Sequence, residues 1–588
     1  MTFKSIGLVV ALFLATFAGL NSNVHAFNID ESVEGFWYES NLNARRGWGF
    51  QYLRTSPETG VFFVAGYIYD DEGFPMWVTG QSTVRDGQFE TDITLQLIGG
   101  GTFAPEQGDP VVIDDNVGNL NIVFKSCNRA DFTFSGGEGP NFTQEFSHFR
   151  EVIGGSREDN CVQQETFIGC PLGIEPGTKP RSCVLRGTYT SDLVLGNHAL
   201  WQLDGVVYIG TPAAFGGGVP QSGPTLFIEA GTRIEGMVGP DALVISRGSK
   251  IIAQGQAHAP IVFSGPYTAT QGAAPGDWGG LVINGAAAIN NCDSVNPCEN
   301  EGEGETGAYG GDDNEDDSGV LRYVRIQFAG GVIDDEQDDD LPGLSLLGVG
   351  SGTVIDHVQV HGIHDDGFKM QGGTVNARHL VASDVGSDSF DFSEGYTGKI
   401  QHALVWQVND DTGSSDRGIE TENNDDPDAL PRTMPTMANV TMVGKMGEAA
   451  IDVSAGSGGR FSNFVISLFG DCIDIDDTAT FAAAGTPASP SNVLLFHNVL
   501  SFCHVDYVYE AGDPWVTEDF VNAFPGNTRL LSPALDGFIP HDYADYLEDY
   551  PLDPDFYDDF FEDVDWMGAF RSRDSAWHYG WTEFLPQE

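Results

Sequence analysis

Basic residues are scarce in this chain of 588 residues. It contains 27 Lys and Arg against 86 Asp and Glu, a formal net charge of −59. A field of this sign repels nucleic acid and anionic membranes, so we expect neither as a partner. Two explanations of the excess acid stay open. One is a solvated surface suited to salty water, where screening weakens self-repulsion. The other is Ca²⁺, which prefers the hard oxygen ligands that Asp clusters offer.

Long hydrophobic runs are missing after residue 26. The opening stretch, MTFKSIGLVVALFLATFAGLNSNVHA, combines an early Lys, an apolar run and a small-residue end, which is typical of a secretory signal peptide. No later run reaches the roughly 18 apolar residues that a membrane helix needs. We therefore expect 1–26 to be a signal peptide and the rest to be secreted, into the periplasm or outside the cell, without a transmembrane segment.

Several catalytic and metal-binding motifs are also absent: the paired CxxC of zinc sites, the nucleophile elbow, the phosphate loop and the dinucleotide fingerprint. Eight cysteines are present, an even number that indicates disulfides in an exported protein. The spacing predicts the pairs Cys170–Cys183, Cys292–Cys298 and Cys472–Cys503, which leaves Cys127 with Cys161.

Residues 27–152 have the composition of a separate β domain, with segments such as GVFFVAGYIYD and PMWVTGQSTV divided by Gly, Asp and Pro. The domain is rich in Trp and Tyr, which either fill a small β core or line a sugar-binding face. A Cys-containing connector, 153–185, follows.

Short Gly-punctuated β segments continue over 186–510, and two families of segments can be aligned. The first contains VRIQF, VQVHG, LVASD, ALVWQ and VTMVG. The second contains LPGLSL, DDGFKM, SDSFDF, DRGIET, EAAIDV, DCIDID and VDYVYE, and recurs every 22 to 34 residues. A base period near 22–24 with loop insertions predicts an all-β fold, a right-handed parallel β-helix with one coil per repeat.

Alternation within the second family predicts which side chains point inward. Phe368, Phe390 and Ile473 belong to the stacked interior, together with the residues two positions later. The residues between them form an outward row: Ser345, Lys369, Asp391, Glu420, Asp452 and Asp474. Coils lie about 4.8 Å apart, so the carboxylates of this row need a cation or a basic side chain between them.

A polar ladder precedes the first family: Tyr323, His357, His379, His402, Asn439, Asn463 and Asn498. Stacked His side chains suit a metal, but stacked polar residues at β-helix turns are also a structural device, and the column continues as Asn. The last segment, 511–588, leaves the repeat and is aromatic and acidic. We expect it to be a C-terminal cap over an exposed end of the helix.

The segments GDWGGLVING, SGVLRYVRIQFAGG, DDGFKMQGGTVNARHLV and VDWMGAF resemble a group of secreted bacterial right-handed parallel β-helix proteins. More distantly, the architecture is similar to that of pectate lyases and polygalacturonases. The resemblance implies acidic residues, and in lyases an Arg or Lys base, on an outward-facing strand row. Asp365–Asp366 matches the paired Asp of polygalacturonases, whereas their Gly–His–Gly and Arg–x–Lys motifs are absent.

The richest cluster of candidate residues lies where two basic side chains meet the row. The catalytic candidates are Lys369, Asp391, Arg417 and Glu420, and the Ca²⁺ candidates beside them are Asp365, Asp366, Asp388 and Asp416. Three interpretations stay open: a polysaccharide lyase with Ca²⁺ and a Lys or Arg base, a glycoside hydrolase with two carboxyl groups, or basic residues that neutralise an acidic row while turn Asp residues cap backbone N–H groups.

Two acidic loops, GGDDNEDDSG and DDEQDDD, have the charge density for Ca²⁺, with Asp312, Asp313 and Asp316 as candidate ligands. The insertion TENNDDPDA, 421–429, either walls a groove or is a solvated loop. The sequence thus predicts an exported, Ca²⁺-binding β-helix protein that binds or processes extracellular polysaccharide. The alternative is a structural or adhesive surface protein.

Overall fold

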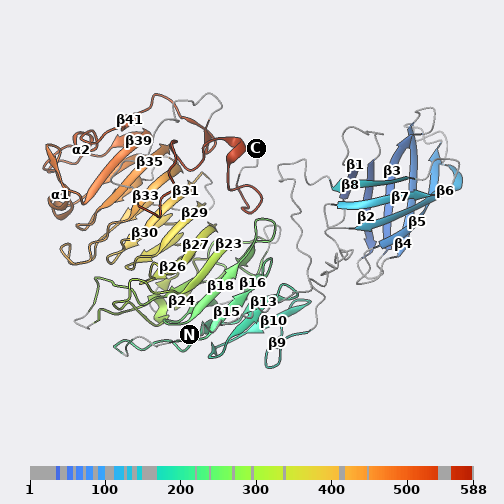
Figure 1. Cartoon of the computed structure of the whole chain (residues 1–588), viewed down its shortest axis with the longest axis horizontal. Coiled ribbons are helices and arrows are strands. Elements are labelled where there is room, and N and C mark those ends of the chain that lie inside the picture. The colour runs from blue at the N-terminus through green and yellow to red at the C-terminus, as the bar shows by residue number, and fades with distance from the viewer. Residues whose placement is uncertain are drawn as a thin grey trace, which may run out of the picture. The chain divides into compact units, whose positions relative to one another are not determined.

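The chain forms two units, divided after residue 151. The computed structural model describes eight strands between residues 35 and 148, and in the larger unit residues 169–216, 218, 222–237, 240–267, 272–292, 297–334, 339–408, 417–445, 449–540 and 558–585 (Figure 1). The predicted signal peptide, most of the predicted connector, Cys127 and Cys161 lie outside the described residues.

The N-terminal unit is a closed barrel in which each strand pairs with the next, and the last pairs with the first in antiparallel register. Successive side chains of a strand point alternately into the barrel and out of it: Ile93 and Leu95 are buried, whereas Asp92 and Thr94 are exposed. The strands are β1 (Gly35–Glu39), β2 (Gly49–Ser56), β3 (Val61–Tyr69), β4 (Pro75–Thr83), β5 (Glu90–Gly99), β6 (Val111–Phe124), β7 (Arg129–Ser135) and β8 (Phe142–His148).

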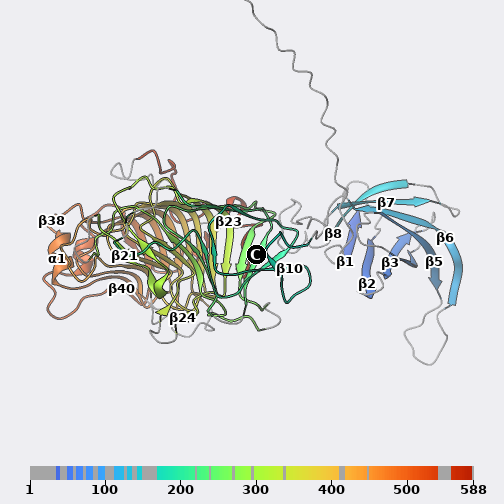
Figure 2. The same ribbon diagram turned by 90° about the horizontal axis from the view of Figure 1, so that it is seen from below.

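The larger unit is a right-handed parallel β-helix whose coils stack in chain order, from green near β10 to orange near β39 (Figures 1 and 2). An 11-stranded parallel sheet forms one side. Its strands are β11 (Thr188–Tyr189), β14 (Val206–Ile209), β17 (Ala242–Ile245), β20 (Gly280–Asn284), β26 (Leu344–Leu347), β28 (Phe368–Gln371), β30 (Phe390–Ser393), β32 (Arg417–Thr421), β34 (Ala449–Val453), β36 (Asp471–Ile475) and β40 (Val505–Tyr507).

A 16-stranded sheet forms the other side. Its strands are β9 (Glu175–Pro176), β10 (Ser182–Leu185), β12 (Leu193–Leu195), β13 (Leu200–Leu203), β15 (Thr225–Ile228), β16 (Arg233–Gly236), β18 (Lys250–Gln254), β19 (Ile261–Ser264), β23 (Gly319–Gln327), β27 (Val354–His361), β29 (Asn376–Ser383), β31 (Lys399–Trp406), β33 (Thr436–Val443), β35 (Gly459–Ser467), β39 (Leu494–Phe502) and β41 (Thr528–Arg529). The two predicted strand families fall into these two sheets.

The interior is one continuous column of apolar side chains. Phe368, Phe390 and Ile473 are fully buried in it, as alternation predicted, and the rings of Phe368 and Phe390 stack at 5.0 Å. Each large side chain removed from water contributes about 1.5–3 kcal/mol. Because this burial is repeated in every coil, it fixes which residues of each strand point inward and therefore which ones face outward.

The polar ladder marks a bend inside each long strand of the 16-stranded sheet. All seven of its residues, from Tyr323 to Asn498, have φ between +50° and +63°. Asn and His tolerate this left-handed conformation better than β-branched residues do. In β27, Ile355 and Val358 are both buried, three positions apart, because the chain turns at His357 between them. The ladder therefore forms a corner of the coil, as its structural interpretation predicted.

Three predicted disulfides are confirmed: Cys170–Cys183, Cys292–Cys298 and Cys472–Cys503. Disulfides are characteristic of proteins in oxidising compartments. Among the described helices, such as α1 (Thr478–Ala484) and α2 (Thr517–Val521), none has the length and apolar character to cross a membrane.

The C-terminal segment packs against two surfaces. Near its start, Phe520 and Val521 of α2 join the column interior and cover the end of the β-helix. Residues 558–585, here called the C-terminal strap, lie on the outward face of the 16-stranded sheet, where Phe570 and Trp581 pack in one apolar cluster with Val381. The segment thus covers a sheet face as well as an end.

Candidate functional site

The outward row on the 11-stranded sheet is formed as predicted. Register pairs Ser345 with Lys369, Lys369 with Asp391, Asp391 with Glu420, Glu420 with Asp452 and Asp452 with Asp474. The row is less open than its outward direction suggests, since Asp391 and Asp452 are only 7 % and 6 % exposed. Inserted loops cover its flanks. Like charges on neighbouring strands therefore meet in a poorly solvated place.

Lys369 holds the middle of the row together. Its Nζ lies 3.0 Å from Glu303 Oε1, 3.3 Å from Asp366 Oδ2 and 3.2 Å from Asp391 Oδ2. Burial disfavours the charged ammonium, but the three carboxylates outweigh burial and raise the pKa of Lys369 well above its usual value. The side chain is therefore protonated and occupies the place that a bound cation would take.

Arg417, at the start of β32, neutralises the next part of the row. Its Nε donates to Asp452 Oδ2 at 2.7 Å, and its guanidinium lies 3.3 Å from Glu420 Oε1. Burial works against the charge, but the hydrogen bond with Asp452 and the charge of Glu420 raise the pKa of Arg417. Both basic residues are thus bound to carboxylates of the row.

The turns before β28 and β30 bring further carboxyl groups beneath these pairs. Asp366 Oδ1 accepts a hydrogen bond from the backbone N–H of Asp388 at 3.1 Å. Burial and the charge of Asp366 raise the pKa of Asp365 to about 7. Burial, followed by the charges of Asp366 and Glu420, raises the pKa of Asp388 to about 10.

Asp388 therefore carries a proton at neutral pH. Glu420 is, after Asp366, the neighbouring charge that contributes most to this shift, and burial raises the pKa of Glu420 as well. A carboxylic acid kept neutral by burial and by neighbouring like charge is a proton donor held near reacting groups. This pair gives the site a capacity for acid–base chemistry.

A cleft of about 570 Å³ opens beside Lys369 and Asp391. Gln371 and Ser393 line it too, two residues further along the same strands and on the same face. The remaining lining comes from loops and the start of α1: Asn291, Glu394, Glu422, Asn423, Asn424, Asp425, Pro427, Ala455, Asp477 and Ala479. The lining is polar and acidic, with a single basic side chain among the described residues.

One side of the cleft contains a network around Glu394. Its Oε2 accepts a hydrogen bond from the Tyr309 hydroxyl at 2.5 Å, and its Oε1 accepts from Asn291 Nδ2 at 2.8 Å and Asn300 Nδ2 at 3.3 Å. Burial raises the pKa of Glu394, and the Tyr309 and Asn291 hydrogen bonds oppose this shift. Three residues that lie 85 to 103 positions earlier in the chain thus position this carboxyl group.

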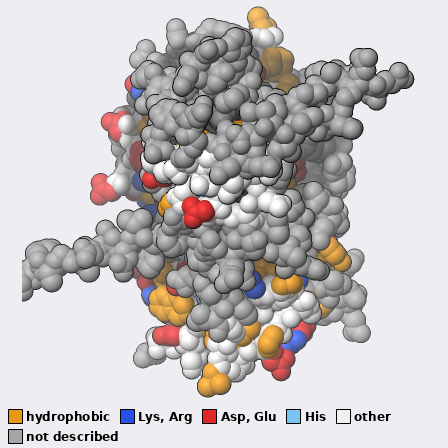
Figure 3. Space-filling model, turned by 90° about the vertical axis from the view of Figure 1, so that its right-hand side faces the viewer, with side chains coloured by type: hydrophobic (Ala, Val, Ile, Leu, Met, Phe, Trp, Pro, Cys, Tyr) orange, Lys and Arg blue, Asp and Glu red, His pale blue; other side chains and the backbone are white. Residues whose placement is uncertain are grey.

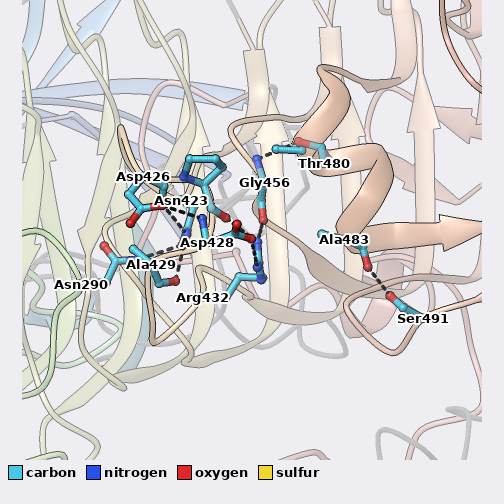
Figure 4. Close-up of polar contacts among 12 residues, drawn as sticks. Asn290, Asn423, Asp426, Asp428, Ala429, Arg432, Gly456, Thr480, Ala483 and Ser491 are labelled. Atoms are coloured by element: carbon cyan, nitrogen blue, oxygen red, sulfur yellow. Dashed lines mark hydrogen bonds and ion pairs between the residues drawn. The ribbon is translucent and has the colours of Figure 1, made fainter.

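The insertion at 421–429 forms the other wall (Figure 4). Asn423 is fully buried and fixes it: Oδ1 accepts from Asn290 Nδ2 at 2.8 Å and from Thr433 N at 2.9 Å, and Nδ2 donates to Ala429 O at 3.0 Å. Arg432 donates to the carbonyl oxygens of Pro427 and Gly456.

Gly456 is required where this wall meets the next coil. Its φ is +74°, and a Cβ there would lie 2.5 Å from Pro427 O. Thr480, in α1, accepts a hydrogen bond from the Gly456 N–H at 2.9 Å. The wall is therefore a structured part of the site. The insertion contributes residues to the cleft lining, as its groove interpretation predicted, while Asp426 and Asp428 are exposed to solvent.

The acidic character continues beyond the cleft over the last coils. Burial raises the pKa of Asp474 to about 7, with the charges of Asp476 and Asp452 adding to the shift. Asp476 has a raised pKa for the same reasons. We call Asp452, Asp474 and Asp476 the acidic strip.

The family model described as a pectate-lyase-like β-helix domain matches residues 187–524. The chain belongs to this family. A comparison with characterised proteins found no match. Among solved structures, the chain is similar to the catalytic domain of a GH87 alpha-1,3-glucanase variant in complex with tetrasaccharides, with 11 % identity, a TM-score of 0.24, and coverage of 85 % of this chain and 92 % of that one.

In this pectate-lyase-like β-helix, the four catalytic candidates lie on adjacent coils. Lys369 and Asp391 line the cleft, whereas Arg417 and Glu420 stand beside it in the row. Among the calcium candidates, Asp365, Asp366 and Asp388 lie at the turns below the row, and Asp416 lies outside the described residues.

The other predicted calcium loop is separate. Asp316 Oδ2 accepts from Ser318 Oγ at 3.0 Å, and Asp313 Oδ1 accepts from Glu315 N at 3.1 Å, so both carboxylates organise the turn. Asp312 is exposed. Calcium at either place stays a prediction.

The histidine ladder carries a different cluster. Asp356 Oδ1 lies 2.7 Å from His357 Nδ1 and 2.8 Å from His379 Nδ1, and the two rings stack at 4.2 Å. Trp577 of the strap packs edge-on against His379 at 5.0 Å. Although burial alone would raise it, the two His hydrogen bonds lower the pKa of Asp356. The ligand atoms of Asp356, His357 and His379 lie within 4.8 Å of one another, so the metal interpretation of the ladder stays a prediction beside the structural one.

Sequence reasoning missed Glu303, Asn291, Glu394 and Asp477. Glu303 and Asn291 lie in insertions, whereas Glu394 and Asp477 follow β30 and β36 within two residues but lie outside the alternating positions of those strands. Gln371 and Ser393 had a usable signal, because they follow Lys369 and Asp391 by two residues and must share their face.

Proposed function

We propose that this chain binds an extracellular polysaccharide in the cleft over the 11-stranded sheet, and that the buried carboxyl groups beside the cleft process it. The observation that carries the proposal is the coincidence of a polar cleft of about 570 Å³, lined by Lys369 and Asp391, with the buried carboxyl group of Asp388, whose pKa is raised to about 10. Sugar recognition needs many hydrogen-bonding groups on a fixed surface, and glycosidic cleavage needs a proton donor.

The three disulfides support export, since they persist in oxidising compartments. Membership of the pectate-lyase-like family supports a carbohydrate ligand, although fold alone does not assign an activity. The walls support specific binding, because the chain buries Asn423 and Tyr309 to hold them in place.

The test is a panel of soluble polysaccharides and oligosaccharides, measured for binding by calorimetry and for product release by reducing-end assay. We expect at least one glycan to bind and the Asp391→Asn protein to lose product release. A second candidate is an adhesive protein whose acidic row is structural. Failure of every glycan, in both binding and product release, contradicts the proposal and favours this second function.

A further inference from the structure

The cleft carries more negative charge than the chain neutralises. Five of its lining residues are acidic: Asp391, Glu394, Glu422, Asp425 and Asp477. Its single basic side chain, Lys369, is already shared with three carboxyl groups. A bound ligand that brought further negative charge would meet this field without a free cation among the described lining residues to receive it.

The negative charge that a ligand can reach lies at the rim of the cleft, which is formed by Glu422 and Asp425. Glu422 and Asp425 are exposed carboxylates on the wall formed by the insertion. Asp477, by contrast, is occupied: its Oδ1 accepts from Ala479 N and Thr480 N, and its Oδ2 accepts from Ala455 N. The two wall carboxylates are therefore the groups that contact a long ligand first.

The acidic strip extends the same field away from the cleft. Asp452 Oδ1 is buried and has no hydrogen-bond donor within the part of the chain that the structure describes, although Oδ2 is bound by Arg417. Burial raises the pKa of Asp474, and the like charges of Asp476 and Asp452 add to the shift. In the view of Figure 3, by contrast, the acidic side chains of the described residues lie interspersed with basic and hydrophobic ones.

Neutral polar groups complete the lining. Ser393 Oγ is buried at the cleft without a partner among the described residues, and the amides of Gln371, Asn291 and Asn424 line the same space. Hydroxyl and amide groups beside carboxylates suit a ligand that has both hydroxyl groups and ammonium groups. A polyuronate offers hydroxyl groups with the wrong charge, and a polycationic peptide offers the charge without the hydroxyl groups.

We propose that the ligand of the cleft is a polysaccharide with free amino groups, such as a polymer of glucosamine. The inference rests on the proposed function and specifies its substrate class. The exposed carboxylates of Glu422 and Asp425 attract ammonium groups of the ligand. Protonated amines also avoid the repulsion that a net charge of −59 imposes on acidic glycans.

The experiment measures binding by calorimetry at pH 5.5 and low salt. The compounds are the hexamers of glucosamine, N-acetylglucosamine and galacturonate, together with hexalysine. We expect the glucosamine hexamer to bind at least tenfold more tightly than each of the others. The Glu422→Gln/Asp425→Asn protein should bind it about three- to twentyfold more weakly, the range for two exposed charge pairs. Added salt should reduce the difference.

The matched control is Glu315→Gln/Asp519→Asn, which removes the same two kinds of exposed carboxylate away from the cleft lining. It should bind the glucosamine hexamer like the unaltered protein. An equal loss in both double variants would mean that net charge alone attracts the ligand, and would overturn the inference.

The other outcomes separate the inference from the proposed function. Equal binding of the N-acetylated hexamer retains the proposed function and overturns the amino-group inference, as does tighter binding of galacturonate with Ca²⁺. If hexalysine binds as tightly as the glucosamine hexamer, the inference that the cleft recognises a saccharide is overturned. Binding of no saccharide contradicts the proposed function itself.

Discussion

Replacement of Lys369 by Met should destabilise the β-helix strongly, and more at high pH than at low pH. The change removes one ammonium that lies within 3.0–3.3 Å of Glu303, Asp366 and Asp391, where the Lys side chain is only 15 % exposed. Removal of one partner from a buried ion pair typically costs about 3–5 kcal/mol, because the other charge stays buried without compensation. We expect a loss of this size at pH 8.

The pH dependence follows from the carboxyl groups left behind. Burial already raises the pKa of Asp391 well above its usual value, and Lys369 opposes that shift. Without Lys369, the folded-state pKa rises further, while the unfolded-state pKa stays near its ordinary value. A group whose pKa is higher in the folded than in the unfolded protein contributes stability that is fully present below the unfolded-state pKa. This stability is lost as the pH rises through the folded-state pKa. The loss should therefore shrink at pH 5, where protons replace the ammonium.

The assay is urea unfolding of the purified protein at pH 5 and pH 8, with Lys250→Met as the control. Lys250 also contacts a carboxylate, Asp317, at 2.5 Å, but both side chains are more than 40 % exposed. Exposed pairs contribute about 0–1 kcal/mol. An equal loss in the two variants, or a Lys369→Met loss that is larger at pH 5 than at pH 8, would refute the reasoning.

Three further predictions concern the site, calcium and the strap. Asp391→Asn should abolish product release from a bound glycan while the melting temperature changes by less than in Lys369→Met; a large drop in melting with unchanged turnover would make the residue structural. Chelation with EGTA should lower the melting temperature of a metal-loaded sample by several degrees, since ligands of the folded state stabilise it, and an unchanged melting curve would count against calcium. Gln401→Ala removes two hydrogen bonds with the backbone of Glu562: Gln401 Nε2 donates to Glu562 O at 3.0 Å, and Gln401 Oε1 accepts from Glu562 N at 2.7 Å. The change should lower the free energy of unfolding by about 1–3 kcal/mol and increase protease cleavage of the strap. Unchanged cleavage near residue 562 would contradict this prediction.

Alternation in the repeat predicted the column and the row because each coil presents its residues with the same parity. Once Phe368 is placed inside, Lys369 must point outward, and in-register stacking carries the assignment to Asp391 and Glu420. The disulfides were predictable from proximity along the chain: Cys292 and Cys298 are separated by 6 residues. In both cases the information is local or repeats from coil to coil.

The cleft was not predictable because its walls depend on contacts between distant insertions. Asn291 meets Glu394 across 103 residues, and Asn290 meets Asn423 across 133. No period connects these positions. The raised pKa of Asp388 could not be predicted either, because its largest cause is burial, which the repeat does not specify at this turn.

The aromatic composition of the strap is compatible with packing against the end of the β-helix or against the face of a sheet. Its aromatic residues predicted a cap over the end of the β-helix, whereas residues 558–585 pack on a sheet face. The signal lay in the strands: Gln359 and Gln401 occupy outward positions yet are fully buried, and each pairs with both the N–H and the C=O of one strap residue, Glu583 and Glu562. A buried amide needs partners for both its donor and its acceptor.

The two sheets thus have different outward faces because their polar residues differ in charge. On the 16-stranded sheet, neutral Gln and Asn side chains bind the backbone of the strap, as in the hydrogen bonds of Asn439 and Asn463 to Trp566 O. Basic side chains of the same sheet form ion pairs with carboxylates of the strap, such as Arg378 with Glu562 and Lys399 with Asp558. On the 11-stranded sheet, the row from Asp391 to Asp474 is charged, and a backbone supplies neither ammonium nor guanidinium groups to satisfy it. Lys369 and Arg417 neutralise only part of the row. Among the remaining carboxyl groups, Asp474 has a pKa that burial raises to about 7, and the groups that stay ionised attract a cationic ligand. This difference in charge leaves one face closed by the protein itself and the other with an open cleft.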